Sequence, residues 1–455
     1  MRKIGNLLCG GLVTVGLLWA SPTLAQTKSV AEEILDILRG NGQISEQQYQ
    51  DLLNKARAEE ENVQAALETK AADPSTFRLY WKEGIRFDSS DGDFKLRIGG
   101  RTMNDWTMYD TDEDIRDSVN DGESIGNGTE FRRARLYIQG DIYQNIQFKA
   151  EYDFAGSEVA FKDVYIQLKE VPFFGSLTVG HFKEPFSLEE LTSSRYITFM
   201  ERSLGIEAFV PSRNTGFMLS NAVFEERATW AVGAFRDVDD TGDGFGRDSP
   251  YNVTARLTAL PWYMDEAQLM HLGFSYSHRF RDDPDSVIQF RSRPEAHLGP
   301  RFVDTGEFEA DGVDLIGPEA ALVYGPFSLQ GEYFGAFTDS EEFDDPNFDA
   351  FYVYASVFLT GEHRVYDMGD GAFDRVSPRR NFDWQGGRGA WEAGFRYASL
   401  DLNDEGIEGG ELDDFTFGLN WYLNPNVRLM FNYVFADLDD SGEANIFESR
   451  LQVDF

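Results

Sequence analysis

Cysteine is almost absent from this 455-residue chain: Cys9 is the only one, and it lies in an apolar run over residues 4–19. A basic pair at residues 2–3 precedes that run, and small residues up to Ala25 follow it. This order predicts a signal peptide over residues 1–25, with a buried N-terminal helix as the alternative. Cleavage would leave the mature chain without a thiol, which excludes a disulfide framework and thiol chemistry.

Positive charge and long apolar runs are also scarce. The chain has 41 Lys and Arg against 79 Asp and Glu, a formal net charge of -38, and this acidity argues against nucleic acid as a partner. After residue 25 no apolar run approaches the roughly 20 residues that a membrane-spanning helix needs. Abundant aromatic residues and glycine exclude disorder. A membrane β-barrel is compatible with these absences, because its alternating strands average out as polar.

Residues 26–75 have the pattern of helix. Apolar residues recur at three- and four-residue spacing on both sides of a Gly-Asn-Gly sequence at 40–42, and Ser45 with Gln48 forms a predicted capping box. The narrow apolar stripe predicts a coiled-coil-like segment, which we expect in the periplasm; a solitary amphipathic helix is the alternative. Asp73-Pro74 ends the segment.

From residue 76 to the C-terminus the hydrophobic period changes to two. In one representative stretch Arg133 and Arg135 alternate with Ala134, Leu136 and Ile138. A soluble β-sandwich alternates in the same way. However, the apolar face here is aromatic at its ends and the polar face is charged, as the lipid-facing girdles and the wet lumen of an outer-membrane barrel require.

The connections between the predicted strands alternate between short and long. Tight turns are predicted at 144–145, 325–326 and 424–426, and long acidic loops at 110–129, 237–249, 282–311, 339–348 and 403–410. We count about sixteen strands, an even number, which lets the sheet close on itself as an all-β, antiparallel transmembrane β-barrel over residues 76–455. The long connection 361–390 falls on the short-turn side, and the alternation does not explain it.

Several stretches resemble the phosphate- and pyrophosphate-selective porins, known as the O/P porins. The resemblance covers nearly the whole mature chain and is strongest at residues 131–135 (FRRAR), 180–189 (GHFKEPFSLE) and 418–426 (GLNWYLNPN). It implies a sixteen-stranded barrel, commonly a trimer, whose third long loop enters the lumen and whose lumenal arginines and lysines guide anions. The chain departs from that pattern in charge, since no lysine follows Lys183.

The candidate site residues are basic residues predicted to face the lumen. They are Arg97, Arg101, Arg133, Arg135, Lys149, Lys183, Arg195, Arg202 and Arg213. Arginine suits oxyanions because its planar fork offers paired donors and stays charged. The alternative is that these cations only form cross-strand pairs with Asp105, Asp141, Glu151, Asp153 and Asp163. Connection 183–212 is the predicted constriction loop, with trimer contact as its alternative role.

One acidic loop loosely resembles a calcium-binding loop. Oxygen ligands at Asp237, Asp239, Thr241 and Asp248 follow the required spacing, with Gly242 at the turn. The helices that flank an EF-hand are absent from the pattern, so a solvated acidic loop is the competing interpretation.

The predicted function is passive diffusion of small anions such as phosphate through a porin in the outer membrane of a Gram-negative-type bacterium. Its expected partners are those anions, outer-membrane lipid and lipopolysaccharide, and two further copies in a homotrimer. A general or cation-preferring porin and a membrane-to-cell-wall anchor are the alternatives. The five histidines are scattered, and no motif joins serine, histidine and an acid, so we predict neither an enzyme nor a cofactor.

Overall fold

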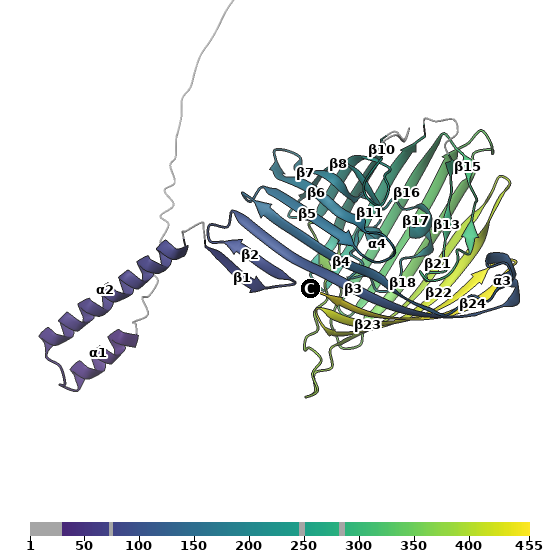
Figure 1. Ribbon diagram of the computed structural model, residues 1–455. Helices are drawn as coiled ribbons and strands as arrows, with labels where there is room; N and C mark the ends of the chain where they lie inside the picture. Colours follow the sequence, from purple (N-terminus) through teal and green to yellow (C-terminus); the bar gives the residue numbers. More distant parts are fainter. Residues whose placement is uncertain (1–29, 72–75, 245–250, 282–286) are drawn as a thin grey trace, which may run out of the picture. The chain divides into compact units, whose positions relative to one another are not determined.

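The computed structural model describes residues 30–71, 76–244, 251–281 and 287–455. The predicted signal peptide lies outside these ranges. The chain divides into two units, Met1–Asp73 and Pro74–Phe455 (Figure 1).

The first unit contains two helices, α1 (Val30–Gly40) and α2 (Glu46–Ala71). Before α2, the backbone N–H of Ser45 donates to Gln48 Oε1 (2.9 Å) and the N–H of Gln48 donates to Ser45 Oγ (3.3 Å), which confirms the predicted capping box. The helices pack together through Leu35 on α1 and Tyr49 and Leu53 on α2. None of the helices in the described ranges is long and apolar enough to cross a lipid bilayer. The coiled coil and its periplasmic placement stay predictions.

The second unit is a β-barrel. Within the described ranges, sixteen antiparallel strands each pair with the next along the chain, and the last pairs with the first from Ala444↔Thr111 to Asp454↔Arg101. The strands are β3 (Phe94–Thr111), β4 (Gly128–Ile142), β5 (Ile146–Asp153), β6 (Ala160–Val171), β7 (Gly175–Lys183), β8 (Arg213–Val223), β9 (Ala228–Arg236), β10 (Asn252–Asp265), β11 (Gln268–Phe280), β16 (Gly312–Tyr324), β17 (Phe327–Asp339), β18 (Asn347–Phe358), β21 (Ala390–Asp404), β22 (Ile407–Asn424), β23 (Val427–Leu438) and β24 (Gly442–Asp454). Closure pairs the backbone groups that an open edge would leave unsatisfied in lipid.

A short hairpin extends the wall beside the C-terminus. Its strands, β1 (Phe77–Trp81) and β2 (Ile85–Ser89), add to the start of β3 through the pair Ile85↔Ile98. β24 occupies the rest of the same edge, and Phe455 exchanges two backbone hydrogen bonds with Gly100 (2.8 and 3.0 Å). The C-terminal residue is therefore built into the barrel seam.

The two faces of the wall differ as the alternation predicts. On β4, Leu136 and Ile138 are about half exposed on the outer face, whereas Arg133 and Arg135 are buried inside. This arrangement gives lipid an apolar surface and places charge in the lumen.

The two rims of the barrel also differ. One rim carries short turns at 143–145, 325–326 and 425–426, together with the C-terminus. The prediction of a loop at 403–410 is wrong, because β21 and β22 continue to a two-residue turn at 405–406 on the other, long-loop rim.

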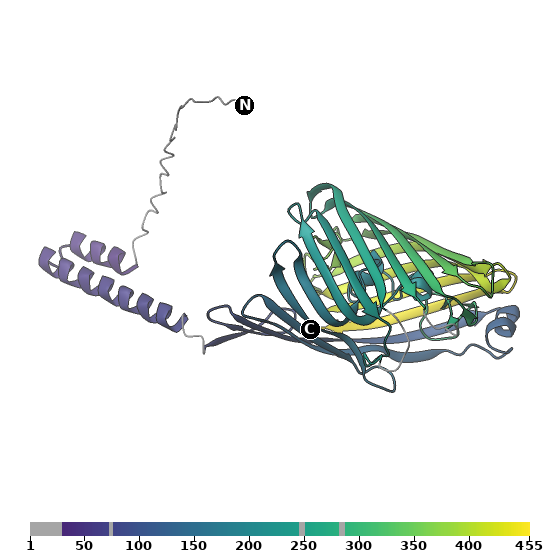
Figure 2. The same cartoon turned by 90° about the horizontal axis from the view of Figure 1, so that it is seen from above.

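Three connections fold into the barrel interior. Figure 2 shows the strands from above, with the short teal helices of the first connection lying inside them. The first is loop 184–212, with the short helices α4 (Leu188–Leu191) and α5 (Leu204–Phe209). The second is loop 287–311, with β12 (Val287–Ile288), β13 (Arg291–Ser292), β14 (Val303–Asp304) and β15 (Phe308–Glu309). Their aromatic residues Phe199, Phe209 and Phe290 form one apolar core with residues of the inner wall such as Phe334 and Tyr354.

The third connection is segment 359–389, whose length the strand alternation could not explain. It forms a hairpin of β19 (Val365–Asp367) and β20 (Ala372–Asp374) that enters the lumen from the short-turn rim. Tyr366 and Phe373 pack there against Leu188 of loop 184–212 and Leu269 of the wall. The two inward-folded connections from opposite rims therefore meet inside the barrel.

Candidate functional site

The predicted basic residues converge on one chamber in the lumen, with a volume of about 280 Å³. Eight of the nine line it: Arg101, Arg133, Arg135, Lys149, Lys183, Arg195, Arg202 and Arg213. The remaining lining residues are Asp163, Tyr165, Leu191, Ser193, Ser194 and Asp370. The wall from β3 to β8 supplies one side of the chamber and loop 184–212 supplies the other.

Ion pairs along the wall hold several of these cations in place. Arg135 Nε lies 2.6 Å from Asp153, and Arg101 pairs with Glu151. Lys149 lies between Glu151 (2.8 Å) and Asp163 (2.5 Å). Two of these pairs, Arg135–Asp153 and Lys149–Asp163, join neighbouring strands, as the alternative interpretation of cross-strand pairing expects. Two of the proposed ladder acids pair elsewhere: Asp105 with Arg450 and Asp141 with Lys169.

Loop 184–212 contributes its own acid and cations. Glu190 Oε1 lies 3.1 Å from Lys183 Nζ, and Glu190 Oε2 lies 3.0 Å from Arg202 Nε. Burial alone would raise the pKa of Glu190, but Arg202 and Lys183 outweigh burial and hold the pKa below its ordinary value. Arg202 also donates to the backbone carbonyls of Glu189 and Thr192. Its guanidinium therefore fixes the loop and still faces the chamber.

Arg195 and Arg133 retain unused hydrogen-bonding capacity. Arg195 forms no ion pair in the described part of the chain, and its Nη1 and the Nε of Arg133 have no hydrogen-bond partner there. Four carboxylates pair directly with the chamber cations, those of Glu151, Asp153, Asp163 and Glu190. A fifth, Glu201, is shared.

Glu201 is shared between the chamber and the anchors of loop 184–212. It lies 2.9 Å from Arg132, 3.9 Å from Arg133 and 2.7 Å from Arg450. Asp370 also lines the chamber, so eight cations face six carboxylates and the chamber is net positive.

Loop 184–212 is held across the lumen by the barrel wall. The fully buried Arg450 on β24 donates to the Met200 carbonyl (2.5 Å), and Arg428 on β23 donates to the Ile197 carbonyl (2.8 Å). On the opposite side, Glu332 of β17 accepts from the N–H of Leu188 (3.0 Å). None of these anchors is among the residues predicted from the sequence, although the two-residue alternation places each of them on the inner face.

Two predicted features lie away from the chamber. Arg97 is near the short-turn rim, 3.4 Å from Glu83. In the acidic loop, Asp237 pairs with Arg279 and Arg281. Asp248 lies outside the described residues, and within them no group of three or more His, Cys, Asp or Glu is arranged to hold a metal. The calcium loop stays an untested prediction, but Asp237 already serves as a partner of arginine.

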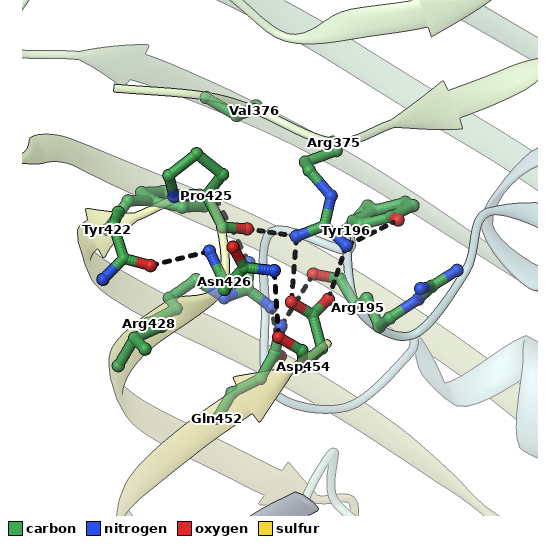
Figure 3. Close-up of a pocket in the computed structure, with 12 residues that line it drawn as sticks. Arg195, Tyr196, Arg375, Val376, Tyr422, Pro425, Asn426, Arg428, Gln452 and Asp454 are labelled. Carbon is green, nitrogen blue, oxygen red and sulfur yellow. Dashed lines mark hydrogen bonds and ion pairs between the residues drawn. The ribbon is translucent and has the colours of Figure 1, made fainter. Parts of the chain in front are cut away.

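Further cavities adjoin the chamber on both sides. Toward the long-loop rim, a cavity of about 300 Å³ shares Arg202 with it. Toward the short-turn rim, a cavity of about 450 Å³ shares Lys183, Leu191 and Asp370. The chamber therefore lies between two further cavities, with which it shares lining residues. A separate cleft beside Arg375 and Asp454 measures about 20 Å³ and is too small for a hydrated solute (Figure 3).

A closed sixteen-stranded barrel with polar cavities along its interior is the architecture of an outer-membrane porin. The chain belongs to the family of phosphate-selective porins O and P, whose sequence pattern matches residues 97–455. It is 26% identical over 444 residues to Porin O of Pseudomonas aeruginosa, covering 87% of this chain and 96% of that protein. It is also 28% identical over 397 residues to an uncharacterized protein of Caulobacter vibrioides, covering 83% of this chain and 77% of that protein.

The fold is similar to that of a solved outer-membrane protein. A loop L8 deletion mutant of OmpT, an outer-membrane protein of Vibrio cholerae, superposes with a TM-score of 0.51 at 11% identity, covering 80% of this chain and all of that one. The resemblance noted in the sequence, the sixteen-stranded barrel and the absence of an enzymatic role are thereby confirmed. The chain is an outer-membrane porin of the O/P family, a non-enzymatic channel.

Proposed function

We propose that this porin conducts small anions, phosphate among them, in preference to cations, and that the basic chamber is the section that selects them. The proposal rests on one observation: eight basic side chains line a single cavity, and fewer carboxylates form ion pairs with them. Relatedness to Porin O and to a family described as phosphate-selective supports the same solute class.

The acidity of the whole chain does not oppose this proposal. Screening confines the reach of a charge to about 8 Å at physiological ionic strength. Acidic loops on the long-loop rim therefore act at the mouth, while the chamber's own cations act on an ion inside it. A narrow path with a local positive field is sufficient for anion preference.

The ion pairs in the wall are consistent with anion conduction. An arginine held by one carboxylate is fixed in direction, and its other N–H groups remain available to a passing oxyanion. Arg101, for example, pairs with Glu151 through Nη2 while Nη1 reaches only the hydroxyls of Ser193 and Ser194. An oxyanion in the chamber can replace these hydroxyls as the acceptor of the Nη1 hydrogen bonds.

The placement of the chain is part of the same proposal. Residues 1–25 act as the signal peptide, 26–75 form a helical segment in the periplasm, and 76–455 form the membrane unit. The short-turn rim faces the periplasm, and the acidic long loops face lipopolysaccharide. The functional assembly is a homotrimer, in keeping with the family resemblance.

The test is the reversal potential in a gradient of potassium chloride across a planar bilayer. Wild type should prefer chloride, and Arg133→Glu combined with Arg135→Glu should reduce or invert that preference. The matched control is Arg78→Glu with Arg227→Glu, which changes the charge by the same amount at exposed positions away from the chamber. Circular dichroism in detergent checks that each variant retains its β-barrel.

If wild type prefers potassium and the chamber double variant leaves the reversal potential unchanged, the arginines act only as ladder partners. The channel would then be the general or cation-preferring porin.

A further inference from the structure

The hairpin of segment 359–389 brings a carboxylate to the basic chamber from the short-turn side. Its tip residue Asp370 lines both the chamber and the adjoining cavity of about 450 Å³. The side chain is exposed to that internal space, and no described residue forms an ion pair or a hydrogen bond with its carboxylate. Asp370 differs in this from Glu151, Asp163 and Glu190, which are all paired with chamber cations.

The barrel wall holds the hairpin in place. Arg364 donates to Gln330 on β17 (2.8 Å), and the Tyr366 hydroxyl lies 2.6 Å from Nδ1 of the buried His271 on β11. Arg256 on β10 donates to the carbonyl of Gly371 (2.8 Å), directly beside Asp370. These contacts come from three strands, so the tip is fixed at its depth in the lumen.

Loop 184–212 and the C-terminus hold the far side of the hairpin. The N–H of Phe373 donates to Thr192 Oγ1 (3.3 Å). Figure 3 shows Arg375 between Asp454, at 2.9 Å from each carboxylate oxygen, and the hydroxyl of Tyr196, at 3.2 Å. In the same view the Arg195 guanidinium points away from this cluster. The hairpin is therefore hydrogen-bonded to loop 184–212 as well as to the barrel wall.

The turn itself orients Asp370. Oδ1 of Asp367 accepts from the N–H groups of Gly369 (2.9 Å) and Asp370 (3.1 Å), which closes the tip. Gly371 follows at φ 62°, a conformation that favours glycine. Asp367 is thus used by the turn, whereas the carboxylate of Asp370 is left to face the cavity.

We propose that Asp370 is a selectivity-determining residue: a tethered carboxylate that competes with passing anions for the chamber's cations and limits how tightly multiply charged anions are held. This inference rests on the proposed anion conduction. A channel must bind its ion weakly enough to release it. A fixed negative charge beside a basic chamber lowers the affinity of that chamber for anions. A dianion experiences twice the repulsion that chloride does at the same position.

The charge of Asp370 depends on pH. Its position inside the barrel, with Asp367 and Asp374 nearby, raises the pKa of its carboxyl to about 6, against the opposing effect of Arg256 and Lys149. The other charged groups that line the chamber around it are Arg101, Arg133, Arg135, Asp163, Lys183, Arg195, Arg202 and Arg213. Above about pH 6 the carboxylate is charged and lowers the affinity of the chamber for anions. Below that pH it is protonated, so the chamber gains net positive charge and binds dianions more tightly.

The experiment compares wild type with Asp370→Asn by the block of chloride current in planar bilayers. The probe is inorganic phosphate at pH 8, and the readout is the phosphate concentration that halves the current. Loss of one charge within several ångströms of the binding cations should lower that concentration about three- to tenfold. Asp370→Glu, which keeps the charge, and Glu266→Gln, an equal charge change on an exposed turn of the short-turn rim, should both match wild type.

A pH series uses sulfate, which remains a dianion between pH 5 and 8. Wild type should be blocked more strongly at pH 5 than at pH 8, and Asp370→Asn should lose most of that difference. An unchanged half-blocking concentration in Asp370→Asn, with chloride preference and phosphate block present in wild type, would refute the role of Asp370 and leave the proposed function standing. Absence of both properties in wild type would instead refute the proposed function.

Discussion

Replacing Arg195 with glutamine tests the electrostatic argument at the cation with the fewest structural duties. Arg195 forms no ion pair within 4 Å in the described ranges; its Nε donates to the Ser193 hydroxyl (3.3 Å), and its guanidinium lies over the Tyr196 ring. The contact that ties this position to the wall is its backbone carbonyl, which accepts from Gln452 (3.1 Å) and survives the substitution. We therefore expect Arg195→Gln to leave the fold intact.

The size of the effect follows from Coulomb's law. An anion about 6 Å from the guanidinium gains about 0.7 kcal/mol in a water-like medium and about 3 kcal/mol at an effective dielectric constant of about 20. Arg195→Gln should therefore raise the half-blocking phosphate concentration by about three- to a hundredfold. Arg135→Gln is a less direct test, because it also leaves the carboxylate of Asp153 unpaired.

The assay is phosphate block of chloride current, with Arg195→Lys as the variant that keeps the charge. Arg195→Lys should remain close to wild type. If phosphate halves the chloride current through Arg195→Gln at the same concentration as in wild type, and circular dichroism shows an intact barrel, the positive field of the chamber does not bind the anion. That result would refute the electrostatic argument.

Three further predictions concern the elements around the chamber. Removing residues 186–206 should raise single-channel conductance, and an unchanged value with an intact barrel would place the narrow section elsewhere. Glu201→Gln leaves Arg132 and Arg450 without their shared carboxylate and should cost about 3–5 kcal/mol, measured as a lower urea midpoint. Burial would raise the pKa of Glu201, but the neighbouring arginines hold that pKa well below its ordinary value. The stability that this carboxylate contributes to wild type should therefore be complete above the ordinary pKa of glutamate and be lost progressively as the pH falls toward the lowered pKa. Deleting 26–75 should remove helical circular dichroism and leave the β signal.

The sequence predicts those parts of the site that depend only on which face of a strand a side chain occupies. A strand's side chains alternate between two faces, so once Leu136 is assigned to lipid, Arg133 and Arg135 must face the lumen. The same parity placed Arg101 and Lys149 inside. Parity does not give depth along the barrel, which is why Arg97 was grouped with the chamber although it lies near the short-turn rim.

The unpredicted parts depend on long-range contacts or on strands that leave the membrane. Acidic residues at 403–410 suggested a loop, but a strand that continues into water tolerates charge on both faces, so hydropathy does not mark where it ends. In segment 359–389, Tyr366 and Phe373 indicate burial, yet their partners lie on the inner wall and on loop 184–212. Nothing local in the sequence identifies those partners, and the carboxylate of Asp370 could not be placed without them.

The most direct test of anion preference is the sign of the wild-type reversal potential in a gradient of potassium chloride at physiological ionic strength. The basic chamber predicts a reversal potential with the sign set by chloride, because an ion in the chamber lies within screening distance of the chamber's cations. A potential with the sign set by potassium would mean that the paired carboxylates and the loops dominate the path, and would contradict the assignment of the chamber as the selecting section.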